Sequence, residues 1–267
     1  MSDSALRSPA TLRSVVRRFL GPTSVGDRVR FAQVMRAIGD LCGPGGRLTA
    51  PQQVRVLDAG CGEGLYAFAL ARKRATWQLH AVDVDARVIQ ACRERRKRER
   101  LANLSFERRD VLALGAARRY DLILAIDLLE HIEDHRAALR SLVEALRPGG
   151  VLVAHVPAAA QHHPFGPTRR ALEAEMASGL SPHRRVGHDE HELLGELAQL
   201  GLRRAQVTHT FGPLVRLLWD LDWWLAAGRW RRPLRALLLP LTLLAPRLDS
   251  APRRGWGNGM LVVACKT

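Results

Sequence analysis

Three glycines at alternate positions, Gly60, Gly62 and Gly64, directly follow an apolar run that contains Asp58 near its end. Glycine tolerates positive φ and leaves the backbone bare, so this pattern predicts a tight strand-to-helix turn that a ligand can approach closely. Asp83 ends a second apolar run about 20 residues further on, where a carboxylate that holds ribose hydroxyls is expected. Together these residues predict a site for a nucleoside cofactor.

The spacing of the glycines narrows the class of cofactor. In the dinucleotide fingerprint G-x-G-x-x-G a third glycine stands where this chain has Leu65. Asp58 at the strand end would repel a pyrophosphate but attract a cationic ligand. Both features disfavour nicotinamide dinucleotides and favour a positively charged adenosine derivative.

Five segments, in this order, resemble the motifs of class I S-adenosylmethionine-dependent methyltransferases of the small-molecule type: 56–64, 80–85, 109–111, 120–132 and 146–153. The resemblance implies S-adenosylmethionine as the cofactor. It also implies an α/β, Rossmann-like fold with a seven-stranded, mostly parallel sheet and helices on both faces. Carried over residue by residue, it implies a cofactor-binding set of Asp58, Gly60, Gly62, Asp83, Val84, Asp110, Val111 and Ile126.

Apolar runs and helical patterns alternate through the middle of the chain, which independently predicts a parallel sheet. We expect strands at about 54–59, 78–84, 104–109, 120–126, 150–156, 203–210 and 259–266, the last of them antiparallel as in the family. We expect core helices at about 64–74, 86–100, 134–146 and 189–200. Residues 11–41 predict one or two further helices, broken at Gly21-Pro22.

These elements suggest three parts: an N-terminal helical segment (1–46), a cofactor-binding core (47–210 with 259–267) and a hydrophobic helical insert (211–258). The insert lies between the last two expected strands, so it should emerge at the carboxyl edge of the sheet, near the cofactor. Its Trp, Leu and Arg composition is typical of interfaces. Three interpretations stay open: a lid over an apolar substrate pocket, a membrane-surface hairpin through 213–246, or an oligomer interface.

Methyl transfer needs the acceptor aligned with the methyl group and, for a hydroxyl or amine acceptor, a base with a pKa near the working pH. His131, just after the expected fourth strand, and His188, before the last core helix, are the candidate catalytic residues. His131 and His135 could share a helical face, but the order differs from H-E-x-x-H and no third ligand is marked. We therefore expect no metal.

The composition limits the partners and the cellular compartment that we expect for the protein. The chain has 41 Lys and Arg against 26 Asp and Glu, a net charge of +15, which suits an anionic partner or Arg-rich solvated faces. Its four cysteines are scattered without a C-x-x-C pair, and neither a signal peptide nor a spanning segment is evident. We expect a cytoplasmic protein, with peripheral contact at the inner membrane face as an open alternative.

The leading hypothesis is S-adenosylmethionine-dependent methyl transfer to the O, N or C atom of a lipophilic small molecule, which the insert would accommodate. One alternative is a nucleic-acid methyltransferase. It is disfavoured because the segment 126–129 lacks both the Pro-Pro pattern of base-amine methylation and a Pro-Cys pair, and because no RNA-binding module is evident. The other alternative is a non-catalytic cofactor-binding scaffold at a membrane surface. An intact glycine turn with Asp83 argues against it.

Overall fold

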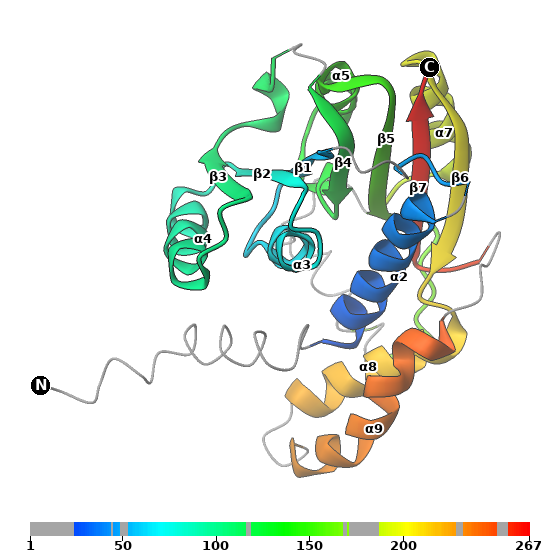
Figure 1. Cartoon of the computed structure of the whole chain (residues 1–267). Helices are drawn as coiled ribbons and strands as arrows, with labels where there is room; N and C mark the ends of the chain where they lie inside the picture. The colour runs from blue at the N-terminus through cyan, green and yellow to red at the C-terminus, as the bar shows by residue number, and fades with distance from the viewer. Residues whose placement is uncertain are drawn as a thin grey trace, which may run out of the picture.

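A seven-stranded sheet in the order β3-β2-β1-β4-β5-β7-β6 organises the computed structural model (Figure 1). The structure describes residues 24–43, 45–48, 53–115, 119–167, 170, 187–227, 232–249 and 256–267. The strands are β1 (Arg55–Ala59), β2 (Gln78–Asp83), β3 (Leu104–Arg108), β4 (Tyr120–Ile126), β5 (Leu146–Pro157), β6 (Leu202–Thr210) and β7 (Gly259–Lys266).

Helices cover both faces of this sheet because its strands are apolar on both sides. On one face, α2 (Val25–Cys42), α3 (Leu65–Lys73) and α4 (Ala86–Glu99) pack on a cluster that includes Val56, Leu122 and Leu124. On the other face, α5 (His135–Ala145) and α7 (Glu190–Gln199) pack on a cluster that includes Leu57 and Ile123. Such two-sided burial is the hallmark of a parallel sheet.

The pairing confirms the mostly parallel, Rossmann-like architecture. Strands β1 to β5 pair in parallel, and β7 runs antiparallel to both β5 and β6. The parallel strands therefore end at one common edge, where β1 leads into α3 and β4 into the short 3₁₀ helix η3 (Leu129–His131).

One boundary differs clearly from expectation. Strand β5 begins at Leu146, whereas the sequence pattern placed its start near residue 150 and continued the preceding helix to 146. Leu146 pairs with Tyr120 before a register shift, and Gly149 in the intervening turn has φ +75°. The Pro-Gly-Gly turn signal thus marks an irregularity inside the paired region rather than the end of it.

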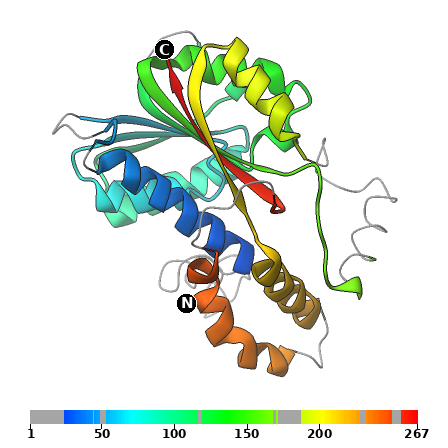
Figure 2. The ribbon, with the colours of Figure 1, turned by 90° about the vertical axis from the view of Figure 1, so that its right-hand side faces the viewer.

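The helix α2 packs against both α8 (Pro213–Ala227) and α9 (Arg232–Leu248), although the chain separates them widely (Figure 2). Val25 and Val29 of α2 share a small apolar cluster with Phe211, Val215 and Ala245. The expected break at Gly21-Pro22 and residues 228–231 of the insert lie outside the described residues. In the described part of the chain, no helix is both long and apolar enough to cross a membrane.

A buried carboxylate holds this three-helix arrangement on the core. Asp249 follows α9 and is 2 % exposed. It accepts hydrogen bonds from the backbone N–H groups of Phe211 and Gly212 at 2.8 and 2.9 Å, and from Gln33 Nε2 of α2 at 2.6 Å. Asp249 therefore connects the start of α8, the end of α9 and the middle of α2.

Replacing Asp249 by Ala should destabilise the protein by about 2–4 kcal/mol, because it leaves two buried backbone N–H groups without their acceptor and removes one of the two acceptors of the Gln33 amide. Urea unfolding followed by tryptophan fluorescence measures this change, with Glu144→Ala on the exposed side of α5 as the control. Equal stability of the two variants would show that Asp249 does not anchor the helices.

Candidate functional site

The turn between β1 and α3 is built from glycines in the left-handed region. Gly60, Gly62 and Gly64 have φ angles of +67°, +49° and +74°. A Cβ at Gly60 would lie 2.6 Å from a Leu128 methyl carbon, and one at Gly64 would lie 2.9 Å from the Phe68 ring. A Cβ at Gly62 would meet no atom within 4 Å. The turn is therefore packed on two sides and open above its central glycine, where a ligand can reach the backbone.

Asp83 ties this turn to the neighbouring strand. Its Oδ2 accepts from the N–H of Gly62 at 2.9 Å, and its Oδ1 accepts from the N–H of Asp85 at 3.0 Å. The carboxylate stands at the end of β2 and is half-buried, so it retains lone pairs toward the open side of the turn. The glycine turn and Asp83, which are about 20 residues apart in the sequence, are therefore in direct contact in the structure.

Asp58 lies beneath the turn as a buried acid. It is 3 % exposed, and its Oδ2 accepts from the N–H of Ala67 at 3.1 Å. Burial, and to a lesser extent the negative charge of Asp83, raises the pKa of Asp58 to about 7. A carboxylate in this condition would be stabilised by a cation placed beside it.

Two thiols support the same turn. The Sγ atoms of Cys61 and Cys92 lie 3.7 and 3.6 Å from the carbonyl oxygen of Gly62. Burial raises the pKa of Cys61 far above its usual range and that of Cys92 to about 12. Both are therefore protonated at neutral pH, which fits a packing role and not a nucleophilic one.

The remaining expected cofactor residues lie at the ends of the adjacent strands. Val84, just beyond β2, is exposed, and Asp110 caps the short 3₁₀ helix η2 (Val111–Ala113) by accepting from the N–H of Leu112 at 2.9 Å. Val111 is buried, and Ile126 is half-buried at the end of β4. The sheet order places Val84, Asp110 and Val111 on one side of the glycine turn and Ile126 on the other.

Beyond Ile126, the structure shows a charged network that the sequence analysis did not identify. Asp127, with φ +49°, pairs with Arg30 of α2 and with His155 Nδ1 at 2.5 Å. The other ring nitrogen of His155 lies 3.0 Å from Thr210 Oγ1. Burial alone raises the pKa of Asp127, but His155 and Arg30 together hold it below its ordinary value. In the sequence, only the position of Asp127 directly after a strand end could have indicated this charged network.

The segment after Asp127 holds Glu130 and the candidate His131. Glu130 is 1 % exposed, and its Oε2 has no hydrogen-bond partner among the described residues. Burial, and then the charge of Asp127, raises the pKa of Glu130 to about 8. His131 is exposed, and its charge acts on Asp127. Glu130, which was not among the candidate residues predicted from the sequence, is thus the inward-facing member of this pair.

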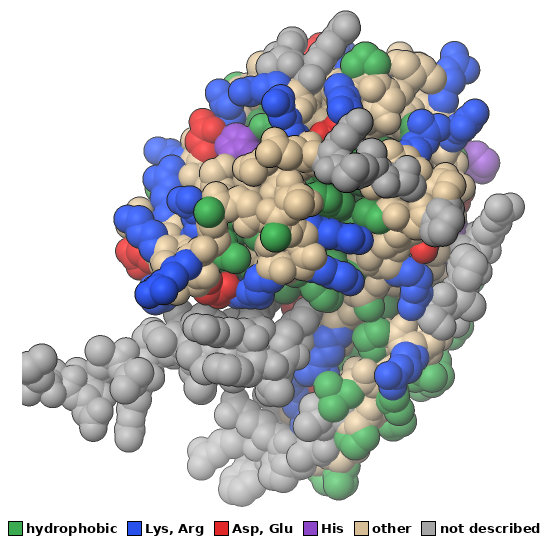
Figure 3. Space-filling model, in the orientation of Figure 1, with side chains coloured by type: hydrophobic (Ala, Val, Ile, Leu, Met, Phe, Trp, Pro, Cys, Tyr) green, Lys and Arg blue, Asp and Glu red, His purple; other side chains and the backbone are tan. Residues whose placement is uncertain are grey.

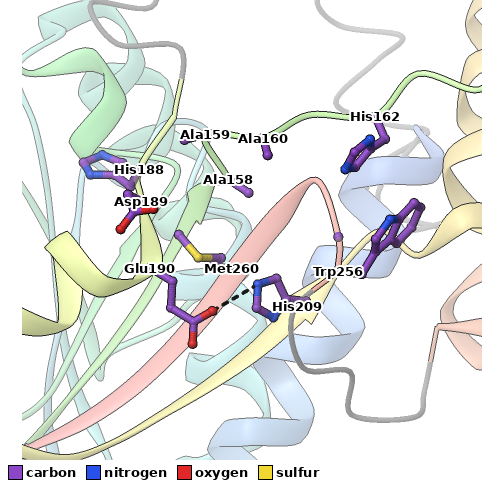
Figure 4. A pocket seen from close by; sticks show the side chains of 11 residues that line it. Ala158, Ala159, Ala160, His162, His188, Asp189, Glu190, His209, Trp256 and Met260 are labelled. Carbon is purple, nitrogen blue, oxygen red and sulfur yellow. Dashed lines mark ion pairs between the residues drawn. The ribbon is translucent and has the colours of Figure 1, made fainter.

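The second candidate, His188, lines a half-open cavity of about 140 Å³ at the ends of β5 and β6 (Figure 4). His188 is buried, and its ring lies edge-on to that of His135 at 5.2 Å. His209 Nε2 lies 3.3 Å from Glu190 Oε2 in the wall of the cavity, and the His162 ring stacks on Trp256. The cavity does not include His131, so the two candidate bases border different parts of the sheet edge.

Over the described ranges, no group of three or more His, Cys, Asp and Glu side chains converges in a way that could hold a metal ion.

Comparison with known sequences identifies a family model described as a methyltransferase domain, which matches residues 51–199. A ubiquinone biosynthesis O-methyltransferase of Acinetobacter baylyi is 25 % identical over 62 % of this chain and 70 % of its own length. One of Methylocella silvestris is 36 % identical over 38 % of this chain, and the match spans only 39 % of that relative.

Solved structures share the fold at low identity. An N-methyltransferase of Bradyrhizobium japonicum in complex with S-adenosyl-L-homocysteine superposes with a TM-score of 0.54 at 19 % identity, covering 93 % of this chain and 91 % of that one. A magnesium protoporphyrin IX methyltransferase of Synechocystis with the same ligand gives 0.58 at 17 % identity, covering 98 % and 96 %.

Replacing Asp58 by Asn should stabilise the ligand-free protein in a pH-dependent way. The folded-state pKa, about 7, lies above the ordinary value, so ionisation of Asp58 costs stability as the pH rises from about 4 to about 7. At about pH 8 the variant should be more stable than wild type by about 1–3 kcal/mol, and at about pH 4 the difference should vanish.

Urea unfolding at the two pH values measures this difference, with the exposed Glu133→Gln as the matched control. A D58N protein less stable than wild type at the higher pH would contradict the raised pKa.

Proposed function

Because the chain belongs to the class I, S-adenosylmethionine-dependent methyltransferases, whose family model matches more than half of it, we propose that it methylates a lipophilic small molecule. The observation that supports methyl transfer is the glycine turn: it is tied to Asp83 and open above Gly62. The curated relatives named as ubiquinone biosynthesis O-methyltransferases favour oxygen as the accepting atom and a quinol-like acceptor.

The residues of the turn fit the cofactor. The open backbone at Gly62, with Gly60 before it in the turn, would lie against its methionine part, and the buried Asp58 would face its ammonium group. Asp83 would accept from the ribose hydroxyls, and the adenine would lie between Val84 and the Asp110-Val111 segment, with Ile126 on the opposite side. When bound, S-adenosylmethionine supplies an electrophilic methyl group on a sulfonium.

The chain's own task is to hold the acceptor and to take its proton. A hydroxyl acceptor must lose its O–H proton when it is methylated, so a side chain would be needed to accept that proton. His188 and His131 are our proposed bases. His188 borders the cavity at the ends of β5 and β6, and an imidazole can accept a proton near neutral pH.

The acceptor would lie along the sheet edge between the glycine turn and the His188 cavity. At a strand spacing of about 4.8 Å, the strands from β1 to β6 place the cavity roughly 10–20 Å from the turn. We propose that the N-terminal segment (1–46) and the insert (211–258) together cover this edge of the core (47–210 with 259–267). Their packing through α2, α8 and α9 supports a joint cap. We also propose a cytoplasmic location.

An acceptor panel tests the substrate class. Purified protein with S-adenosylmethionine should release S-adenosylhomocysteine with lipophilic phenols and quinols, and more slowly with their carboxylated, water-soluble analogues. The Asp83→Ala variant serves as the inactive control. Turnover restricted to the water-soluble analogues would overturn the lipophilic assignment without touching the cofactor site.

Asp83→Ala should weaken S-adenosylhomocysteine binding by about 10- to 100-fold or more, because hydrogen bonds to a charged acceptor contribute about 1.5–3 kcal/mol each. Isothermal titration calorimetry measures this loss. Asp85→Ala is the matched control: it removes a carboxylate two residues away that caps α4 and makes no contact with the glycine turn in any described hydrogen bond. If both variants bind like wild type, the cofactor lies elsewhere.

A further inference from the structure

The helix α9 turns its apolar side to solvent. Leucines at three- and four-residue spacing form one exposed stripe along it, and the most exposed of them, Leu237, is 75 % exposed. The stripe consists of Leu234, Leu237, Leu241, Leu244 and Leu248. Helices of a folded domain normally direct such a stripe inward, so this orientation calls for an apolar partner.

The inward side of α9 carries polar contacts as well as the buried Ala245. Thr242 is buried and accepts from Arg28 of α2 at 3.1 Å. Arg235 pairs with Asp222 of α8 at 2.6 Å, and Asp249 at the helix end anchors Gln33. These contacts fix the rotation of α9 about its axis, so the leucines cannot turn inward without breaking buried polar interactions.

The sequence of the insert is strongly basic. Residues 211–258 contain eight Arg, no Lys, no Glu and only three acids, Asp220, Asp222 and Asp249. All three acids are buried, and Asp220 and Asp222 pair with Arg216 and Arg235. Space filling shows hydrophobic side chains with Arg among them at the end of the molecule formed by α8 and α9 (Figure 3). Among the described residues of the insert, the exposed surface thus carries the leucines of α9 and Arg247, and no acid.

We propose that the leucine face of α9, with Leu214 and Trp223 of α8, docks on the surface of an anionic lipid membrane. Exposed Leu and Trp beside Arg is the composition of an element that lies in the interface, and phospholipid headgroups supply the matching negative charge. A second copy of this chain fits less well: a two-fold contact would bring the same positive surfaces together without an exposed acid of the insert to pair with them.

This membrane contact requires neither a cofactor nor an acceptor, so its test is independent of the proposed reaction. The full chain is mixed with vesicles of phosphatidylcholine, with or without phosphatidylglycerol, and binding is measured by flotation. Tryptophan emission, to which the half-exposed Trp223 contributes, reports insertion. We expect binding to the anionic vesicles, a blue shift of the emission, and weaker binding in high salt.

The variant Leu237→Glu with Leu241→Glu should reduce vesicle binding by about tenfold or more, because it places charge where apolar side chains would enter the interface. Lys97→Gln with Arg98→Gln on the exposed side of α4 lowers the net charge equally and should change binding by less than about threefold. Unfolding midpoints check that both variants fold.

Three results would overturn the proposal. The first is no binding of the wild-type chain to anionic vesicles, and the second is an equal loss of vesicle binding in the two variants. The third is a wild-type dimer that does not form in the leucine variant, with no vesicle binding by either protein.

Discussion

The hydrogen bond from the Gly62 N–H to the Asp83 carboxylate is the constraint on which the candidate site depends. It joins a left-handed turn after one buried strand to the end of the next, and so converts two separate sequence motifs into one open cradle. The glycines make the turn sterically accessible, and the parallel sheet brings the strand ends to one edge. The buried Asp58 then gives this cradle a preference for positive charge.

The second organising feature is polar burial outside the core. Asp249, Gln33 and the Arg235–Asp222 pair join α2, α8 and α9, beside a small apolar cluster between the same helices. The consequence is that leucines which would ordinarily form a core are left on the surface. The packing of α9 on α2 and α8 therefore has two results: buried charged groups anchor the helix, and its leucines remain exposed.

The sequence was sufficient to predict the sheet, most element boundaries and the family, because the two-sided burial of β1 and β4 imposes continuous apolar runs. It was insufficient for interactions between distant segments. Nothing near Arg30 or Asp249 in the chain signals their partners Asp127 and Gln33, since those contacts exist only after α2, α8 and α9 assemble. The raised pKa of Glu130 likewise depends on burial that the exposed neighbour His131 does not share.

The most direct measurement is a crystal structure of the full chain grown with saturating S-adenosylhomocysteine. The account predicts the ribose hydroxyls within about 3 Å of the Asp83 carboxylate oxygens, the amino acid part over Gly62, and the adenine beside Val111. A nucleoside bound away from the β1–α3 turn, or one whose ribose makes no contact with Asp83, would contradict it.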